Sequence, residues 1–210
     1  MDDDFMTVKT LLPTTPLPSN DTRPALTTNR LLIRPLGPSD LDAMHTLRTQ
    51  PEVMQWTSSG RIDQNIEETR DKLNLFLPPN DTTTVNCAIC VKDTGEFIGF
   101  GGCHLFPAEH GWPEMGYLLR REFWGRGMAT EFLGAWLRFW DQLPRSEREV
   151  RVRRGMVAGE GAVKEHLIAI TETSNVPSQK VLLKSGFERF REFTEDGGET
   201  QLVAFHYPRQ

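Results

Sequence analysis

Apolar residues recur with two different periods along the chain, and the period changes near residue 80. Before that point two stretches show a spacing close to 3.6 residues, for example at Leu73 and Leu77, which predicts helices after one short strand. Ser39 or Asp40 is placed to cap the first helix, and two prolines close the second. The elements expected here are a strand at 30–36, a helix at 37–50 and a helix at 59–77.

The period then shortens to two, which predicts three successive strands, and later segments alternate between strands and helices. Pro177 in a first helical turn and Gly186 just past a last turn mark the final helix. A turn at 196–198 separates the last two strands. The elements expected here are strands at 82–91, 96–106 and 113–120, a helix at about 127–140, a strand at 166–173, a helix at 176–186, and strands at 187–194 and 200–207.

This order of elements predicts an α+β (mixed α/β) fold. Hairpins in the middle and crossover helices later imply a central mixed, mostly antiparallel sheet of about six to seven strands with helices on both faces. Residues 1–28 are rich in Pro and Thr, so we expect a tail without regular elements. Residues 29–210 are expected to form one domain with a basic insert at about 141–165.

Composition narrows the classes of function. The formal net charge of -5 argues against a nucleic-acid surface, which normally has a basic footprint. No segment approaches the ~18 consecutive apolar residues of a membrane span, so we expect no membrane partner. The opening residues MDDDF are acidic where a targeting signal would be basic, which makes a cytoplasmic location the expectation.

Two of the three cysteines form a C-x-x-C motif, Cys87 and Cys90. The motif lies in a strand-like run with no second cysteine pair, so buried strand residues are the favoured interpretation over a redox or zinc site. We therefore expect no metal.

The junction GYLLRREFWGRGMATEFL, from residue 116, joins an apolar strand to a long amphipathic helix. Free N–H groups at a helix start attract anions, and Gly125 and Gly127 would let a phosphate approach them closely. A tight strand-to-helix turn is the alternative interpretation. A P-loop and a dinucleotide fold both fit badly, because their glycine and lysine patterns are missing. Positive charge around the turn comes from Arg120, Arg121 and Arg126.

With these motifs the sequence resembles the GCN5-related N-acetyltransferase (GNAT) superfamily, in the branch that is similar to ribosomal-protein N-terminal (RimJ/RimL-like) acetyltransferases. The segment PEMGYLLRREFWGRGMATEFL is similar to the superfamily's acetyl-coenzyme A signature, and TETSNVPSQKVLLKSGF to its second conserved segment. Trp124 stands where Gln or Arg is commonest in the superfamily, although Trp is normal in this branch.

The resemblance implies acetyl-coenzyme A as cosubstrate. The backbone of residues 126–130 would bind its diphosphate, and the strand end at Leu118 and Leu119 would pair with its pantetheine arm. Asn175 would hold the pantetheine or the neighbouring loop, and Ser178 would point at the sulfur. The cofactor-binding residues expected in this way are Leu118, Leu119, Arg120, Arg126, Gly127, Met128, Ala129, Thr130, Asn175 and Ser178.

Acetyl transfer to an amine requires a base and a donor near the departing thiolate. Glu114 is the candidate general base, with a solvent-facing strand carboxylate as the alternative. Ser178 is the candidate donor, although Ser is also an ordinary first-turn residue. The N–H of Leu119 is a candidate oxyanion donor. Secondary base candidates are His104 and His110, and aromatic residues that either line an acceptor pocket or pack are Trp56, Phe106 and Trp112.

The expected function is acetyl transfer to a primary amine of a small molecule, an amino acid or a protein N-terminus. A non-catalytic acyl-coenzyme A sensor of the same fold is the alternative. The protein is expected to be a monomer or a homodimer. The arginines of the insert, Arg145 to Arg154, leave from the far end of the helix, so a solvated loop is favoured for them, with a partner contact next.

Overall fold

The computed structural model describes residues 4–108, 110–157, 163–194 and 198–208, and its chain divides into two compact units. We call residues 15–104 and 116–140 the turn unit, because they contain the glycine turn. We call residues 1–14, 105–115 and 141–210 the ribbon unit, because they contain a two-stranded ribbon. Each unit is described by itself. No helix in the described part of the chain is both long and apolar enough to cross a membrane.

The turn unit combines antiparallel strands with four α-helices. Strand β6, Glu114–Leu119, begins in the ribbon unit and ends in this one. Its other strands are β2 (Leu26–Thr27), β3 (Leu31–Pro35), β4 (Val85–Val91) and β5 (Phe97–Leu105). Its helices are α1 (Leu41–Arg48), α2 (Pro51–Met54), α3 (Ile66–Asn74) and α4 (Met128–Gln142).

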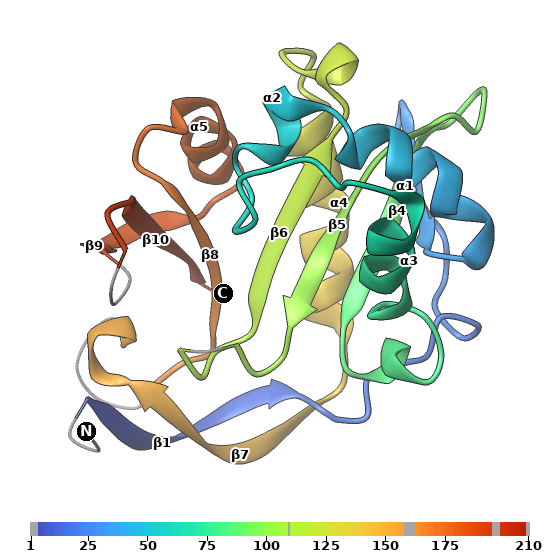
Figure 1. Ribbon diagram of the computed structural model, residues 1–210. Helices are drawn as coiled ribbons and strands as arrows, with labels where there is room; N and C mark the ends of the chain where they lie inside the picture. Colours follow the sequence, from blue (N-terminus) through green and yellow to red (C-terminus); the bar gives the residue numbers. More distant parts are fainter. Residues whose placement is uncertain (1–3, 109, 158–162, 195–197, 209–210) are drawn as a thin grey trace. The chain divides into compact units, whose positions relative to one another are not determined.

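Helices cover both faces of the turn unit's strands. Helices α1 and α3 lie over one face of β4 and β5, and α4 lies behind the other (Figure 1). On the first face a buried apolar cluster joins Met44, Leu73 and Phe100. On the second face the Trp136 indole donates to the Val85 carbonyl oxygen at 3.3 Å. Alternation along the strands therefore divides the side chains of the unit between two apolar layers.

The ribbon unit contains a separate two-stranded ribbon of β1 (Phe5–Pro13) and β7 (Arg145–Arg153), paired antiparallel. Its other elements are β8 (His166–Glu172), α5 (Val176–Lys184), β9 (Glu188–Thr194) and β10 (Gln201–Pro208). The apolar side of the ribbon belongs to a buried cluster with the hairpin before β6, formed by Val8, Leu12, Trp112, Val152, Met156, Ile168 and Ala204.

The strands outside the ribbon pair in the order β2-β3-β4-β5-β6-β8-β10-β9. Strands β6 and β8 are parallel, at Glu114 and Ile168, whereas β2–β3, β3–β4, β4–β5, β8–β10 and β9–β10 are antiparallel. The prediction of a mixed, mostly antiparallel sheet is confirmed. Within the described residues it has eight strands rather than six to seven, because the two-residue β2 lies in the stretch expected to be irregular.

Two expectations about local structure are wrong. Residues 5–13, expected to lack regular structure, form β1, and residues 145–153, expected to be a solvated loop, form β7. Strand β1 alternates mainly buried and exposed positions, and β7 alternates half-buried and exposed ones with Val152 buried. Neither strand is apolar enough to be identified without its partner. The domain division at residue 28 stays a prediction. The insert's residues 158–162 and the turn residues 196–197 lie outside the described residues.

One helix begins later than the sequence predicts, for an identifiable reason. Helix α3 begins at Ile66 instead of residue 59, because the Asn65 side chain caps it by accepting from the N–H groups of Glu67 and Glu68. Asp40 lies at the N-cap of α1 as expected, without a side-chain capping bond. Gly186 follows α5 with a φ of 88°, as the sequence predicts.

Candidate active site

The turn before α4 leaves its backbone open. After β6 a short 3-10 helix, Arg121–Phe123, leads into Trp124, and the turn follows with Gly125 at a φ of 71° and Gly127 at 75°. These left-handed conformations favour glycine. A Cβ atom placed on Gly125 would meet nothing within 4 Å, and one on Gly127 would meet only the Arg30 guanidinium, at 3.5 Å. Apart from Arg30, no described side chain beyond the glycines' own chain neighbours comes within 4 Å of either position.

The amide groups at this turn remain available. The first hydrogen bond of the helix runs from the Glu131 N–H to the Gly127 carbonyl oxygen, at 3.1 Å. Among the described residues, no hydrogen bond uses the N–H groups of residues 126–130. A helix start with unpaired N–H groups carries about half a positive charge and is suited to bind an anion. We call residues 125–130 the amide cradle.

The three arginines near the amide cradle differ in what they contact. Arg120 forms an ion pair with Glu96 at 2.9 Å, and Arg121 forms one with Glu52. Arg126 is exposed, stacks on the Phe123 ring at 5.5 Å, and has no carboxylate partner among the described residues. Arg126 is therefore the arginine whose charge is available to a bound anion.

The end of β6 presents one residue outward. The Arg120 N–H donates to the Ile98 carbonyl oxygen on β5 at 2.8 Å, and the Leu118 carbonyl oxygen lies against Gly99 on the same strand. Since backbone polar groups alternate along a strand, those of Leu119 point away from β5. The Leu119 carbonyl oxygen accepts from the Trp124 indole at 2.7 Å. Of the two residues expected to meet the pantetheine arm, Leu119 is the one with the suitable orientation.

In the ribbon unit, Glu114 is half-buried at the start of β6, and the backbone around it is well fixed. The Pro113 carbonyl oxygen accepts from the Ile168 N–H at 2.9 Å. Trp112 is fully buried, and its indole donates to the Met156 carbonyl oxygen at 2.8 Å. The hairpin thus holds the carboxylate on a rigid strand.

Asn175 caps α5. Its side-chain oxygen accepts from the Ser178 N–H at 3.2 Å, and Pro177 lies in the first turn. Asn175 and Ser178 are both half-buried. Capping is thus a structural role of Asn175, and it leaves the amide nitrogen on the other side of the carboxamide.

Comparison with known protein families supplies the identity of the fold. The family pattern described as "Acetyltransferase (GNAT) domain" matches residues 30–188. The chain belongs to the GNAT acetyltransferase family. It is accordingly an acyltransferase.

Two curated relatives are similar in sequence. The uncharacterized N-acetyltransferase p20 of Bacillus licheniformis is 32% identical over 110 residues, which cover 50% of this chain and 60% of p20. The uncharacterized N-acetyltransferase YoaA of Bacillus subtilis (strain 168) is 24% identical over 195 residues, covering 89% of this chain and 99% of YoaA.

Solved structures share the GNAT fold at lower identity. A GNAT-family acetyltransferase from Bacillus anthracis has a TM-score of 0.65 at 19% identity, covering 87% of this chain and 97% of its own. RimL, a ribosomal L7/L12 α-N-protein acetyltransferase in complex with coenzyme A, has 0.66 at 15%, covering 87% and 96%. The microcin C7 self-immunity acetyltransferase MccE, in complex with acetyl-CoA and AMP, has 0.64 at 12%, covering 85% and 92%.

The two candidate histidines, His104 and His110, are poorly suited to be bases. Burial, with a smaller effect of Lys72, lowers the pKa of His104 to about 4. An imidazole with so low a pKa is neutral at pH 7 and a weak proton acceptor. His110 is buried, with its ring packed edge-on against Phe193 at 5.6 Å. Glu114 remains the stronger candidate.

The cysteine pair in β4 is not arranged like the paired thiols of a metal or redox site. Cys87 and Cys90 are three residues apart on one strand, so their side chains point to opposite faces. Both are buried free thiols, and burial raises the pKa of Cys87 to about 12, whereas a reactive or metal-binding cysteine needs a lowered pKa. Across residues 4–108, 110–157, 163–194 and 198–208, no group of three or more His, Cys, Asp or Glu is placed to hold a metal.

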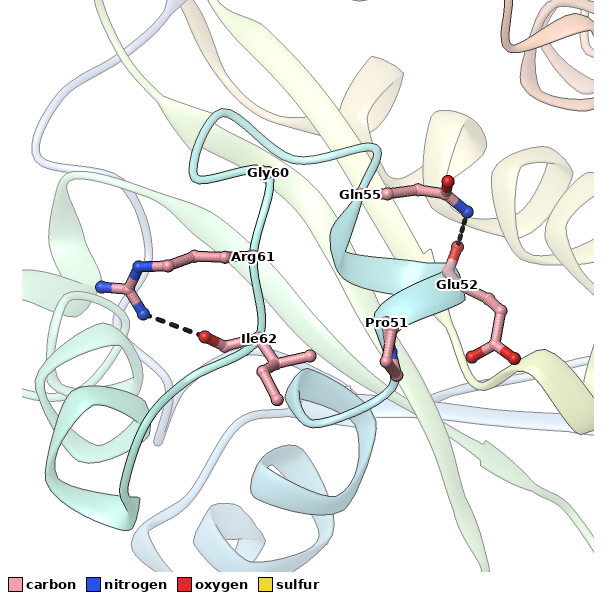
Figure 2. Close-up of a pocket in the computed structure, with 6 residues that line it drawn as sticks. All are labelled: Pro51, Glu52, Gln55, Gly60, Arg61 and Ile62. Carbon is pink, nitrogen blue, oxygen red and sulfur yellow. Dashed lines mark hydrogen bonds between the residues drawn. The ribbon is translucent and has the colours of Figure 1, made fainter.

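A cavity of about 350 Å³ lies beside α2 in the turn unit. Figure 2 shows α2 on one side and the loop through Gly60 on the other. The lining residues are Pro51, Glu52, Gln55, Gly60, Arg61 and Ile62. None of the aromatic residues suggested for an acceptor pocket lines it. Phe106 and Trp112 pack in the core of the ribbon unit, and Trp56 is half-buried next to Gln55.

Sequence reasoning missed the side chains that hold the glycine turn. The Gln50 carboxamide accepts from the Arg121 N–H at 2.9 Å and donates to the Glu122 carboxylate at 3.0 Å. Arg30 contacts both Glu131 and the Arg126 carbonyl oxygen. A first-turn acidic residue at position 131 was a visible signal, but nothing in the sequence linked it to a residue a hundred positions earlier.

Proposed function

We propose that this protein is an acetyl-coenzyme A-dependent N-acetyltransferase that acts on a primary amine. The observation that carries the proposal is the amide cradle, with its unpaired N–H groups and the uncommitted charge of Arg126. A diphosphate matches such a site in charge and in its number of acceptor oxygens. Bound acetyl-coenzyme A is known for the fold neighbour MccE and coenzyme A for RimL, which supports the choice of ligand.

Acetyl-coenzyme A would supply an activated acyl group as a thioester. The amine nitrogen forms a bond to the carbonyl carbon, the bond from that carbon to sulfur breaks, and the sulfur leaves as a thiolate that takes up a proton. The protein has to hold the thioester, remove a proton from the ammonium group and stabilise the departing sulfur. In this proposal residues 126–130 and Arg126 hold the diphosphate, and the outward edge of Leu119 meets the pantetheine arm.

Glu114 is proposed as the base and Ser178 as the proton donor to the thiolate. Glu114 lies at the start of strand β6, in the ribbon unit, where the hairpin before it fixes its backbone. Asn175, whose side-chain oxygen caps α5, would orient the helix start that carries Ser178.

The acceptor is proposed to be a primary amine of a small molecule, an amino acid or a protein N-terminus. RimL acts on the α-amino group of ribosomal protein L7/L12, whereas MccE confers immunity to microcin C7. The acceptor is tested by incubating the protein with acetyl-coenzyme A and a set of amines and measuring the release of free thiol. The set should contain N-terminal peptides, amino acids and aminated nucleotides.

Calorimetry with coenzyme A tests the cradle directly. Arg126→Ala is expected to weaken binding about tenfold, because it removes one charge-assisted contact to phosphate. Arg138→Ala is the matched control, since Arg138 is exposed on the same helix about 15 Å farther along and should bind like wild type. Absence of heat from wild-type protein with coenzyme A would contradict the proposed cofactor. Binding without turnover on any amine would instead support the sensor alternative.

A further inference from the structure

A carboxylate in the first turn of α4 is bound from outside the helix. Glu131 Oε1 accepts from the Thr28 hydroxyl at 2.6 Å and from the Arg30 N–H at 2.9 Å. Glu131 Oε2 accepts from Arg30 Nε at 2.6 Å, and Arg30 Nη2 lies 2.6 Å from the same oxygen. The Glu131 side chain is 18% exposed, whereas the Arg30 side chain is 47% exposed, so the carboxylate is the shielded partner of the pair.

The same arginine reaches the glycine turn. Arg30 Nη1 donates to the Arg126 carbonyl oxygen at 2.8 Å. In a planar trans peptide the carbonyl of one residue and the N–H of the next point in opposite directions. By holding the Arg126 carbonyl on one side, Arg30 therefore directs the Gly127 N–H to the other. The Gly127 backbone has left-handed φ and no side chain, so few other contacts restrain it.

The network also removes an electrostatic conflict. An isolated carboxylate in the first turn stabilises a helix, but it repels a second anion bound at the same end. Although burial acts in the opposite direction, hydrogen bonds from Thr28 and Arg30 hold the pKa of Glu131 below its usual value, so it is ionised. Arg30 balances this charge, with two nitrogens of its guanidinium group on one Glu131 oxygen.

We propose that Arg30 and Glu131 are positioning residues for the diphosphate, acting through the Arg126–Gly127 peptide rather than by touching the ligand. This inference rests on the proposed binding of coenzyme A. Arg30 belongs to the segment between β2 and β3, so a residue far from the turn in sequence sets the direction of one of its N–H groups.

Three variants test the role by calorimetry with coenzyme A. Arg30→Met, Arg30→Lys and Glu131→Gln are each expected to weaken binding about tenfold, because phosphate hydrogen bonds depend on direction. Lysine keeps the charge but cannot span both Glu131 and the carbonyl, so it should not restore affinity. The double variant Arg30→Met/Glu131→Gln should be no weaker than either single variant, since both act through one contact. Pantetheine, which lacks the diphosphate, should bind all variants alike.

Glu131→Gln separates positioning from charge alone. It removes a negative charge beside the diphosphate, so a purely electrostatic role would make binding tighter, whereas loss of positioning makes it weaker. The controls are Arg70→Met and Glu67→Gln. These two residues form a 2.9 Å ion pair on the exposed side of α3, so neither substitution should alter binding. Thermal unfolding without ligand checks that each variant is folded. If Arg30→Met does not fold, the single variants Arg30→Lys and Glu131→Gln provide the test.

The outcomes distinguish the two levels of the proposal. If wild-type protein binds coenzyme A and these variants bind equally well, or if Glu131→Gln binds more tightly, the positioning role is wrong and the cofactor assignment stands. If wild-type protein does not bind coenzyme A, the proposed function is wrong, and the positioning role is wrong with it.

Discussion

Glu114 is the residue on which the proposed chemistry depends most. It is half-buried at the first position of β6, where the backbone is fixed by the contact from Ile168 to Pro113 and by buried Trp112. The neighbouring histidines offer little competition, because burial lowers the pKa of His104 to about 4 and His110 packs against Phe193. A carboxylate held on a rigid strand is suited to accept a proton repeatedly in one geometry.

Glu114→Gln is expected to lower kcat roughly 100-fold, because the amide keeps the shape of the side chain but cannot accept a proton. The KM for acetyl-coenzyme A should stay unchanged, since the proposed cradle lies elsewhere. Steady-state kinetics with any amine that wild-type protein acetylates provides the measurement. Glu147→Gln, at an exposed position of β7, is the control and should behave as wild type. Equal kcat in both variants would assign the base to another group.

Single residues were predictable from sequence where their role is local. Gly125 and Gly127 could be identified because a left-handed turn before a helix leaves a short, specific pattern. Arg30 and Gln50 could not, because each acts on a residue about a hundred or seventy positions away, and an exposed polar side chain carries no sign of its partner. The distinction between Leu118 and Leu119 also needed the strand pairing. Backbone polar groups alternate between the two edges of a strand, but the sequence does not say which residue faces which edge until one inter-strand hydrogen bond is known.

At the scale of elements, the ribbon of β1 and β7 shows what pairing adds to weak sequence signals. Strand β1 places Val8 and Leu12 in the buried cluster and leaves Leu11 55% exposed. Strand β7 contributes Val152 to the same cluster, although six of its nine residues, RSEREVRVR, are charged. The long helix α4 was predicted closely, because its amphipathic pattern needs no distant partner. The ribbon depends on pairing between two segments far apart in the sequence, and the sequence of either strand alone does not predict it.

Leu12→Ala is expected to lower the free energy of unfolding by about 2–4 kcal/mol, because it leaves a cavity in the buried apolar cluster of the ribbon unit. Leu11→Ala on the same strand is the matched control, and its exposed side chain should change stability by no more than about 0.5 kcal/mol. Urea denaturation of both variants measures the difference. Similar stabilities would mean that β1 contributes little to the core of the ribbon unit.

At the scale of the whole molecule, buried histidines make the stability of the fold depend on pH. The ribbon unit buries His166 against Trp112, with ring centroids 4.9 Å apart, and against His206 at 5.1 Å. Burial, and to a lesser degree the charge of His206, lowers the pKa of His166 from 6.5 to about 4. Burial also lowers the pKa of His206.

Stability should therefore decrease as the pH falls from 6.5 toward 4. In this window the unfolded chain binds protons at these histidines and the folded chain does not, so protonation favours unfolding. Urea denaturation at pH 7, 6 and 5 measures the slope. His166→Phe, which keeps a ring of similar size, should make the slope shallower. A slope identical to that of wild type would show that other groups govern the pH response.

The sheet class and the family were predictable at this scale because the glycine turn, the Asn-capped helix and the run of strands occur in a fixed order along the chain. The division into two units was not, because it depends on contacts between segments far apart in sequence. Strand β6 passes from one unit to the other between residues 115 and 116, and no change in composition marks that point.

The pairing of Phe5 with Arg153 has a consequence for synthesis on the ribosome. Residues 5–13 are translated long before their partner, residues 145–153, so until that strand emerges their backbone groups have no native strand to bond. Contacts between residues this distant in sequence slow folding. Until they form, the unpaired edge of the strand can pair with other nascent chains. The exposed charge of Lys9 on this strand disfavours pairing with another chain until Glu149, its ion-pair partner, has been translated.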